Sequence, residues 1–476
     1  MTARVRFAPS PTGEMHIGNV RTILYNYIFA KQNGGAVILR VEDTDQGRFD
    51  PKALESIYEG LPWVGITWDE GPREGGPHAP YVQSERLPIF QEHARRLVES
   101  GDAYPCFCSV ERLAAMRAAQ QARKEITRYD GLCRKIDPSE AAERASRESH
   151  VIRLKVPDEG TIALEDLVHG HVEWPLAAIE DQILLKSDGF PTYQLAVIVD
   201  DHLMGVTHVL RADEWLPSTP KHLLVYRAFG WTPPQHGHVP VVLGADGKKL
   251  SKRHGATGLA EFRAQGFLPE ALVNYLALVG WAPGTEDEIF SMDDLIQRWR
   301  IDQVQKAGGK WDYERLRWFN GVWIRKLSHD ELCRRLLPFL PEEWDRAVVR
   351  AAIPFIQERM QTLTEARALI AFLFQDLAPE AAGLLPKKRS AAEARDVLSH
   401  ARSALGELEP FEHAGIETSL SAVATDLGWK QGEVNMAVRL AVTGTQVGPP
   451  LYESIVLLGR ERALDRIDRA IATLGG

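Results

Sequence analysis

Two polar loops, far apart in the chain, carry residue types that can bind the phosphates of a nucleotide. The first loop, Pro9–Asn19, reads PSPTGEMHIGN and follows a short apolar run, Val5–Ala8. Gly13 and Gly18 allow the backbone to approach a ligand closely, because they have no Cβ. A helix that begins near His16 would direct backbone N–H groups and a positive dipole end toward phosphate.

The second loop, Lys248–Arg253, reads KKLSKR. Lys249 and Lys252 are mobile point charges that suit a transition state at an α-phosphate, where negative charge builds as pyrophosphate leaves. Ser251 can donate a hydrogen bond. Taken alone, a lysine-rich loop is most often a hairpin tip, and a lone histidine such as His16 is most often a helix cap. Together the two loops indicate nucleotide chemistry, with His16, Lys249, Ser251 and Lys252 as candidate catalytic residues.

The elements around the first loop form a βαβ unit. Val5–Ala8 and Ala36–Val41 are β-prone runs, and apolar residues recur at helical spacing between them. Parallel pairing places both strand ends on one edge of a sheet, so the loop Pro9–His16 should lie beside Glu42–Asp45. Ligands bind at that edge in open α/β sheets.

A second block supplies the remaining strands of the same sheet. Its β-prone or amphipathic segments are Leu195–Val199, Thr207–Leu210, Trp215–Phe229 and Val239–Leu243. The Lys248–Arg253 loop follows the last of these segments, so it also belongs at the ligand edge.

Composition describes a large folded enzyme. The chain has 476 residues, of which 44% are hydrophobic and 25% charged, so three or more domains are expected. The net charge of -9 argues against a nonspecific nucleic-acid coat protein, although a local basic face is still compatible with RNA binding. Arg112–Arg134 and Arg315–Lys326 are basic stretches, for which a solvated helix face is an equal alternative. Without a signal peptide or a long apolar run, we expect a cytoplasmic protein with no membrane partner.

A long insertion, Glu85 to about Gln194, separates the two blocks and should form an α+β lobe of its own. It contains Cys106, Cys108 and, after 24 intervening residues, Cys133. Three thiolates in one lobe favour a tetrahedral zinc ion, which needs a fourth ligand. Three reduced cysteines without metal are the alternative.

The motifs HIGN and KLSKR resemble the two signature sequences of class I aminoacyl-tRNA synthetases, HIGH and KMSKS. Further segments resemble the bacterial glutamyl-tRNA synthetases over essentially the whole chain, and these segments are Arg6–Gly13, Arg40–Asp45, Phe190–Tyr193, Val199–His202 and Arg211–Trp215. Asn19 and Arg253 depart from the signatures, since an amide replaces the second histidine and a guanidinium replaces the final serine.

The resemblance implies an α/β Rossmann-type catalytic domain with an α+β acceptor-binding insertion, followed by a helical stem-contact domain and an all-α anticodon-binding domain. The expected boundaries are 1–84 and 195–245 for the two catalytic halves, 85–194 for the acceptor-stem insertion, 246–321 for the stem-contact domain with its KLSKR loop, and 322–476 for the anticodon domain.

The reaction that the resemblance implies has two steps. Glutamate and ATP, with Mg²⁺, give glutamyl-adenylate, and the glutamyl group then passes to the terminal adenosine of tRNA(Glu). ATP binding is implied for Pro9, Ser10, Thr12, Gly13, His16, Gly18, Asn19, Lys249, Leu250, Ser251, Lys252 and Arg253. Glutamate binding is implied for Arg6, Ala8, Ser10, Glu42, Tyr193 and Arg211, with Glu42 on the α-ammonium group; an N-cap or surface salt bridge is the alternative for Glu42.

Three points stay open beside this interpretation. In related zinc-bearing synthetases, the fourth zinc ligand is a histidine two residues after the last cysteine or a tyrosine four residues before it. Here Lys135 stands at the first of these positions. By this resemblance, the expected zinc site is therefore Cys106, Cys108, Cys133 and Tyr129. tRNA(Gln) is a second candidate substrate. We expect a monomer.

Each of three competing functions predicts a different sequence in the second loop or in the C-terminal half of the chain. A truncated paralogue that attaches glutamate to a modified base shares the catalytic half but lacks the roughly 150 residues after Val322. A noncatalytic tRNA-binding descendant would not need the lysines of the second loop. A small-molecule adenylyltransferase would not need an RNA-sized helical half.

Overall fold

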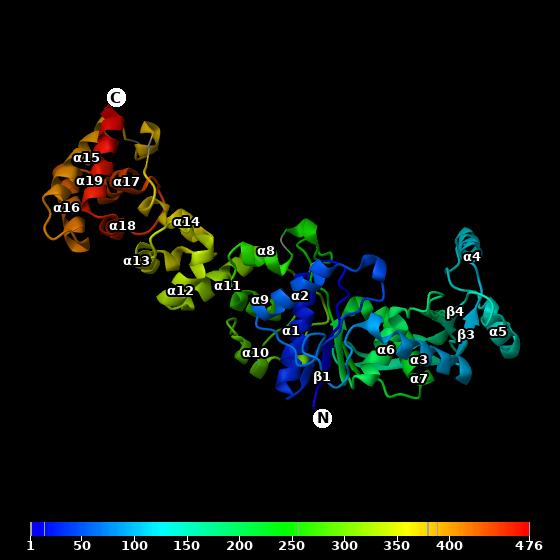
Figure 1. Cartoon of the computed structure of the whole chain (residues 1–476). Helices are drawn as coiled ribbons and strands as arrows, with labels where there is room; N and C mark the ends of the chain where they lie inside the picture. Colours follow the sequence, from blue (N-terminus) through cyan, green and yellow to red (C-terminus); the bar gives the residue numbers. More distant parts are fainter. Residues whose placement is uncertain (1, 14, 256, 378–379, 388, 476) are drawn as a thin grey trace. The chain divides into compact units, whose positions relative to one another are not determined.

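The chain folds into two compact units, which we describe separately. The computed structural model describes all residues except 1, 14, 256, 378–379, 388 and 476. Within the described residues, it describes every side chain except that of Lys252. Unit 1 contains Met1–Phe262 and Leu272–Asp312, and unit 2 contains Arg263–Ala271 and Tyr313–Gly476. Figure 1 follows the chain through both units. No helix in the described part of the chain has the length and apolarity to cross a membrane.

The predicted βαβ unit opens unit 1. Strand β1 (Arg4–Phe7) pairs in parallel with β2 (Ala36–Leu39), and helix α1 (Ile17–Gln32) makes the crossover between them. The helix starts where it does because the Nδ1 atom of His16 accepts a hydrogen bond from the Gly18 amide and so caps it. Its inward face carries Ile17, Val20, Ile23, Leu24 and Ile28, all fully buried.

A four-stranded sheet continues the core of unit 1, in the order β6-β5-β9-β8. Its strands are β5 (Thr161–Asp166), β6 (Gly170–Pro175), β8 (His208–Ala212) and β9 (Gln235–Val239). Strand β8 adjoins β1, since the Thr207 amide donates to the Arg4 carbonyl over 2.9 Å. Two strands of the predicted insertion, β5 and β6, therefore share a sheet with strands of the second block.

One predicted strand is wrong. Leu195–Val199 lies inside helix α6 (Tyr193–Leu203), whose residues from Leu195 to Asp201 are all buried. A helix that is apolar on every side gives the same short hydrophobic run as a buried strand, so periodicity could not separate the two. Val239–Leu243 is also only partly strand, because β9 ends at Val239.

The insertion holds a second, three-stranded sheet with the order β3-β4-β7. It consists of β3 (Ala103–Cys106), β4 (Val151–Leu154) and β7 (Ile183–Leu185), and β4 is antiparallel to both neighbours. Helices α4 (Val110–Ala122) and α5 (Pro138–Ala145) lie together beyond these strands (Figure 1). The other helices that contribute to unit 1 are α2 (Pro51–Trp63), α3 (Leu87–Ser100), α7 (Thr219–Ala228), α8 (Leu259–Ala264), α9 (Pro269–Leu278) and α10 (Met292–Arg298).

The second loop is a tight hairpin followed by a helical turn. Leu243 and Lys249 form an antiparallel bridge, and Lys252–His254 forms a short 3-10 helix. A lysine-rich hairpin tip was the alternative expected for this segment, and the segment is indeed a hairpin, of which Lys249 lines the pocket described below.

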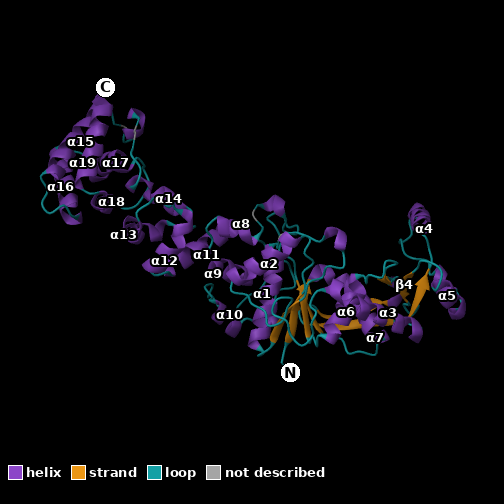
Figure 2. Cartoon of the chain, in the orientation of Figure 1, coloured by secondary structure: helices purple, strands orange, loops and turns teal. Residues whose placement is uncertain are grey.

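The regular secondary structure in the described residues of unit 2 is all helical (Figure 2). Its helices are α11 (Tyr313–Lys326), α12 (His329–Leu336), α13 (Arg346–Ile356), α14 (Glu365–Ile370), α15 (Ala391–Gly406), α16 (His413–Asp426), α17 (Gln431–Thr443), α18 (Leu451–Leu458) and α19 (Arg460–Gly475). One continuous hydrophobic core joins them, from Leu268 through Ile353 and Val397 to Leu474. Unit 2 therefore has a core of its own.

Candidate active site

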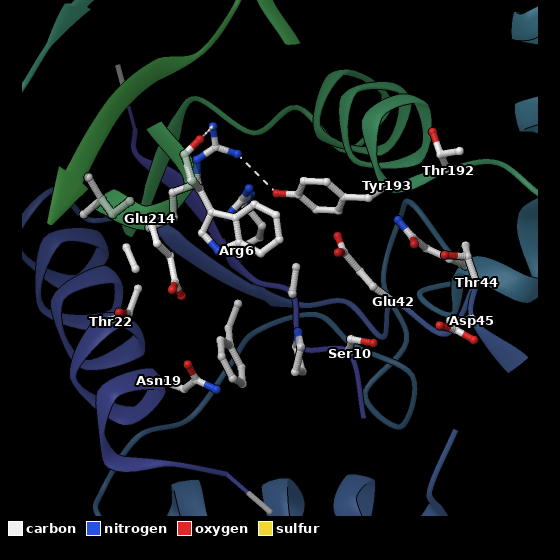
Figure 3. Close-up of a pocket in the computed structure, with 18 of the residues that line it drawn as sticks. Arg6, Ser10, Asn19, Thr22, Glu42, Thr44, Asp45, Thr192, Tyr193 and Glu214 are labelled. Carbon is white, nitrogen blue, oxygen red and sulfur yellow. Dashed lines mark hydrogen bonds between the residues drawn. The ribbon is translucent and has the colours of Figure 1, made fainter. Parts of the chain in front are cut away.

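A pocket of about 780 Å³ opens in unit 1 at the carboxyl ends of β1 and β8. It lies between the loop after β1, the start of α6 and the residues that follow β2 (Figure 3). Nine residues of the predicted site line it: Arg6, Ala8, Pro9, Ser10, Asn19, Glu42, Tyr193, Arg211 and Lys249. The expected contact between the first loop and the Glu42 segment is present, because the Glu42 amide donates to the Pro9 carbonyl over 2.9 Å.

A buried network of ion pairs holds one wall of this pocket. The Nε atom of Arg6 donates to both oxygens of Asp201 at 3.1 and 3.2 Å. Arg40 bridges Asp201 at 2.7 Å and Glu42 at 2.9 Å. All four residues are at most 8% exposed, so each side chain is held in a fixed orientation by partners rather than by solvent.

The two carboxyl groups of this network respond to burial differently. Burial raises the pKa of Glu42, and the attraction of Arg40 opposes that rise only in part. Burial would also raise the pKa of Asp201, but Arg6 and Arg40 together outweigh it and lower that pKa. Asp201 is therefore the firm counter-charge of the two arginines, whereas Glu42 is a pocket carboxylate that a cationic ligand would stabilise. In Figure 3 the Glu42 carboxylate is directed into the pocket, toward the ring of Tyr193.

Arg211 is a buried cation whose bonds all go to neutral groups. Arg211 donates hydrogen bonds to Tyr193 Oη at 3.2 Å, to Thr219 Oγ1 at 2.8 Å and to His238 Nε2 at 3.0 Å. Its Nη1 atom also lies 3.2 Å from His222 Nδ1. Among the described residues, no carboxylate forms an ion pair with Arg211. A pocket wall with an unneutralised guanidinium is a receptor for a carboxylate ligand.

The amino end of α1 supplies a second type of ligand site. His16 is half-buried, and because its Nδ1 atom accepts the Gly18 amide, the ring proton lies on Nε2. The first turn of α1 carries no acidic residue, so its dipole stays attractive to an anion. Thr12 and Gly13 are exposed in the preceding loop.

The KLSKR loop contributes one lysine to the pocket wall. Lys249 Nζ lies 2.5 Å from Glu214 Oε2, and both residues line the pocket. The other members differ: Leu250 is buried, the Ser251 amide donates to His254 Nδ1 at 3.0 Å, and Arg253 pairs with Asp246 at 3.4 Å. The side chain of Lys252 lies outside the described part of the structure.

The structure thus brings the proposed glutamate residues together more tightly than the proposed ATP residues. Thr12, Gly13, His16, Gly18, Leu250, Ser251 and Arg253 do not line this pocket. Sequence reasoning missed Asp201, Glu214, Thr219, His222 and His238. Asp201 and Glu214 fall inside the quoted segments Val199–His202 and Arg211–Trp215, so their polarity was a usable signal; the histidines had no local pattern.

The three cysteines of the insertion converge with Tyr129. Their Sγ atoms all lie within 4.8 Å of one another, and those of Cys108 and Cys133 are 3.5 Å apart. Tyr129 Oη lies 3.4 Å from Cys106 Sγ and 3.5 Å from Cys108 Sγ. Tetrahedral zinc with sulfur ligands requires donor separations of about 3.8 Å, so this donor set fits the ion.

Comparison with known proteins identifies the chain's relatives. Residues 2–318 match the family of class I tRNA synthetases (E and Q), catalytic domain, and residues 331–471 match an anticodon binding domain. A glutamate–tRNA ligase of Dehalococcoides mccartyi is 46% identical, over 99% of this chain and 98% of the relative. One from Treponema denticola is 43% identical, over 99% of each.

The chain belongs to the glutamate–tRNA ligase family.

A solved structure agrees with this assignment. The glutamate tRNA ligase from Elizabethkingia meningosepticum, determined in complex with its amino acid, superposes with a TM-score of 0.93 at 35% identity and covers 100% of both chains. These findings confirm the predicted family, the predicted fold class and the predicted activity, ATP-dependent attachment of glutamate to tRNA. Residues 331–471 match an anticodon-binding domain, which argues against the truncated paralogue.

Proposed function

We propose that the pocket of unit 1 binds glutamate by its three charged groups and activates it as glutamyl-adenylate. Arg211, with Tyr193, receives the side-chain carboxylate, and Arg6, which also lines the pocket, is the second guanidinium. Glu42 receives the α-ammonium group. The observation that carries the proposal is the buried guanidinium of Arg211, which has hydrogen bonds only to neutral partners and no ion pair among the described residues.

The phosphate chemistry is assigned to the two loops. ATP enters as substrate with Mg²⁺. The first turn of α1 and His16 stabilise the triphosphate, while Lys249, Ser251 and Lys252 compensate the negative charge that develops at the α-phosphate as pyrophosphate leaves. Thr12, Gly13, Gly18, Asn19, Leu250 and Arg253 shape the nucleotide site. The exposure of Lys249 beside the pocket supports this role.

The second substrate is tRNA, and we assign the remaining parts of the chain to it. Residues 85–194 hold the acceptor end, 246–321 contact the stem, and 322–476 read the anticodon through unpaired bases. The choice between tRNA(Glu) alone and tRNA(Glu) together with tRNA(Gln) then depends on unit 2. Charging the two purified tRNAs side by side measures that choice.

Arg211→Ala tests the glutamate site. Loss of charge-assisted hydrogen bonds to a carboxylate corresponds to about 3 kcal/mol, so the KM for glutamate should rise by about a hundredfold. The KM for ATP should change by less than about threefold, because the nucleotide lies outside the Arg211 contact. Pyrophosphate exchange, measured with and without tRNA, provides both constants. An unchanged glutamate KM would remove Arg211 from the binding site.

Cys106, Cys108, Cys133 and Tyr129 would hold a structural zinc ion, which would cross-link β3 to the segment before α5. We expect one equivalent of zinc in purified protein and its loss in Cys108→Ser. Cys333→Ser is the matched control, because Cys333 lies in α12, outside the cluster. Tyr129→Phe should weaken zinc retention during chelation. Zinc-free protein at full cysteine reduction would contradict the site.

A further inference from the structure

Two polar side chains, those of His238 and Asp166, lie behind Arg211 and outside the lining of the pocket. His238 of β9 is the register partner of Arg211 on β8, and the His238 side chain is completely buried. Its Nδ1 atom lies 2.6 Å from Asp166 Oδ2, at the end of β5. Its Nε2 atom faces Arg211 Nε at 3.0 Å and Thr219 Oγ1 at 3.0 Å. The Asp166 carboxylate, the His238 imidazole and the Arg211 guanidinium therefore follow one another in this order toward the pocket.

The hydrogen-bond pattern permits only one state of the His238 ring. Asp166 accepts at Nδ1, so the proton lies there, and the Nε2 lone pair is left to accept from Arg211 and Thr219. A proton on Nε2 would point at the guanidinium donor. Burial lowers the pKa of His238, although Asp166 opposes this, and a neutral ring is the form that can accept.

Asp166 is itself fixed in position. Its Oδ1 atom accepts from the amides of Val168 at 2.9 Å and His169 at 3.0 Å, and both of its oxygens lie 3.2 Å from the His238 amide. Its carboxylate therefore cannot turn away from the ring. On this side of Arg211, the Asp166 carboxylate is separated from the guanidinium by the His238 imidazole. The guanidinium therefore has no directly bonded carboxylate here, and its positive charge remains available to a ligand in the pocket.

We propose that Asp166 and His238 are positioning residues that set glutamate affinity, by holding the Arg211 guanidinium toward the pocket as a cation with no carboxylate bonded to it. This inference rests on the glutamate-binding role proposed above for Arg211. A carboxylate bonded directly to Arg211 would compete with the side chain of the substrate. An imidazole in between supplies orientation without that competition.

Asp166→Asn tests the tautomer. The three backbone amides retain the side-chain oxygen, so the new NH₂ group faces Nδ1 and forces the ring proton onto Nε2, opposite the guanidinium of Arg211. The KM for glutamate should rise by at least about tenfold, while kcat and the KM for ATP change by less than about threefold. His238→Phe, which keeps the volume and removes the acceptor, should behave in the same way.

His238→Gln is the conservative rescue, because its amide oxygen can replace Nε2 as acceptor. Its glutamate KM should stay below that of His238→Phe. His236→Gln is the matched control: His236 is another buried histidine of β9, its ring stacks on that of His238 at 6.0 Å, and it has no bond to Arg211. It should leave the glutamate KM unchanged.

The outcomes separate this inference from the proposed function. If Arg211→Ala raises the glutamate KM but Asp166→Asn and His238→Phe do not, the positioning role is overturned and the glutamate site stands. If Arg211→Ala has no effect, both are overturned. Equal losses in kcat and in the ATP constant would show a structural role only. For the wild-type enzyme, ¹⁵N-histidine NMR with glutamate bound should show His238 protonated at Nδ1; protonation at Nε2 would overturn the inference without any variant.

Discussion

Lys249 and Glu214 form an ion pair at the pocket wall, and a nucleotide that binds Lys249 as proposed above would have to break it. Their side chains are 61% and 43% exposed, so the pair contributes only about 0–1 kcal/mol to stability. A triphosphate that approaches Lys249 competes with the Glu214 carboxylate and is also repelled by it. Under the proposed role of Lys249, the pair would therefore be a small barrier to nucleotide binding.

Glu214→Gln should lower the KM for ATP by about two- to fivefold, because it removes that competition. The melting temperature should stay within about 1 °C of the wild-type value. Steady-state kinetics and thermal unfolding measure the two quantities. Glu173→Gln, an exposed acid of β6 outside the pocket, controls for net charge. A higher ATP KM in Glu214→Gln would mean that Glu214 assists the nucleotide.

Single residues of the site also differ in whether the sequence alone could predict them. Arg6, Glu42 and Arg211 could be predicted because local motifs surround them, and all three line one pocket. The pairing of these residues with their supporting side chains could not be predicted, even where, as for Asp201, the supporting residue lies in a recognisable segment. Asp201 lies 195 residues from Arg6, and Asp166 lies 72 residues from His238. A counter-charge at such a separation is chosen by the tertiary fold, so no spacing in the sequence indicates it.

Helix α1 is capped by His16, for which we also propose a chemical task. The Nδ1 atom of His16 caps the helix, and the Nε2 side of the ring is the proposed phosphate donor. His16→Asn keeps a capping acceptor and removes the imidazole, whereas His16→Ala removes both.

We expect His16→Asn to keep the stability within about 0.5 kcal/mol and His16→Ala to lose about 1 kcal/mol. Both variants should slow pyrophosphate exchange by at least about tenfold, because the donor is absent in each. Urea unfolding and exchange rates provide the comparison. If only His16→Ala were slow, His16 would act through the cap alone.

At the level of elements, the sequence predicted the local units and missed their partners. The βαβ unit was predicted with its bounds nearly correct, since periodicity and capping are local. The error at α6 came from complete burial, which removes the polar face that marks a helix. The pairing of β5 with β9 was also missed, because strand pairing across an insertion leaves no local signal.

The described part of the molecule divides into two units, and the pocket belongs to one of them. All residues of the pocket belong to unit 1, and unit 2 has its own helical core. A ligand stabilises the part of a protein that binds it, by about 2.7 kcal/mol at one hundred times its Kd.

Calorimetry should therefore resolve two unfolding transitions. Glutamate with a nonhydrolysable ATP analogue should raise the temperature of one transition by several degrees and leave the other unchanged. In Arg211→Ala the shift should shrink at the same glutamate concentration. Equal shifts of both transitions, or one transition only, would contradict independent units.

The neighbour of β1 has a consequence for synthesis on the ribosome. Arg4 bonds to Thr207 across 203 residues of chain, so one edge of the first strand stays unpaired until the later block has emerged. During that interval the nascent chain exposes a strand edge and the apolar face of α1, which are the features that chaperones bind and that promote aggregation. Strand β1, which borders the pocket, is thus among the first strands made, whereas β8, on the other border, follows only with the later block. The site that the two strands frame can form only after about half of the protein has been translated.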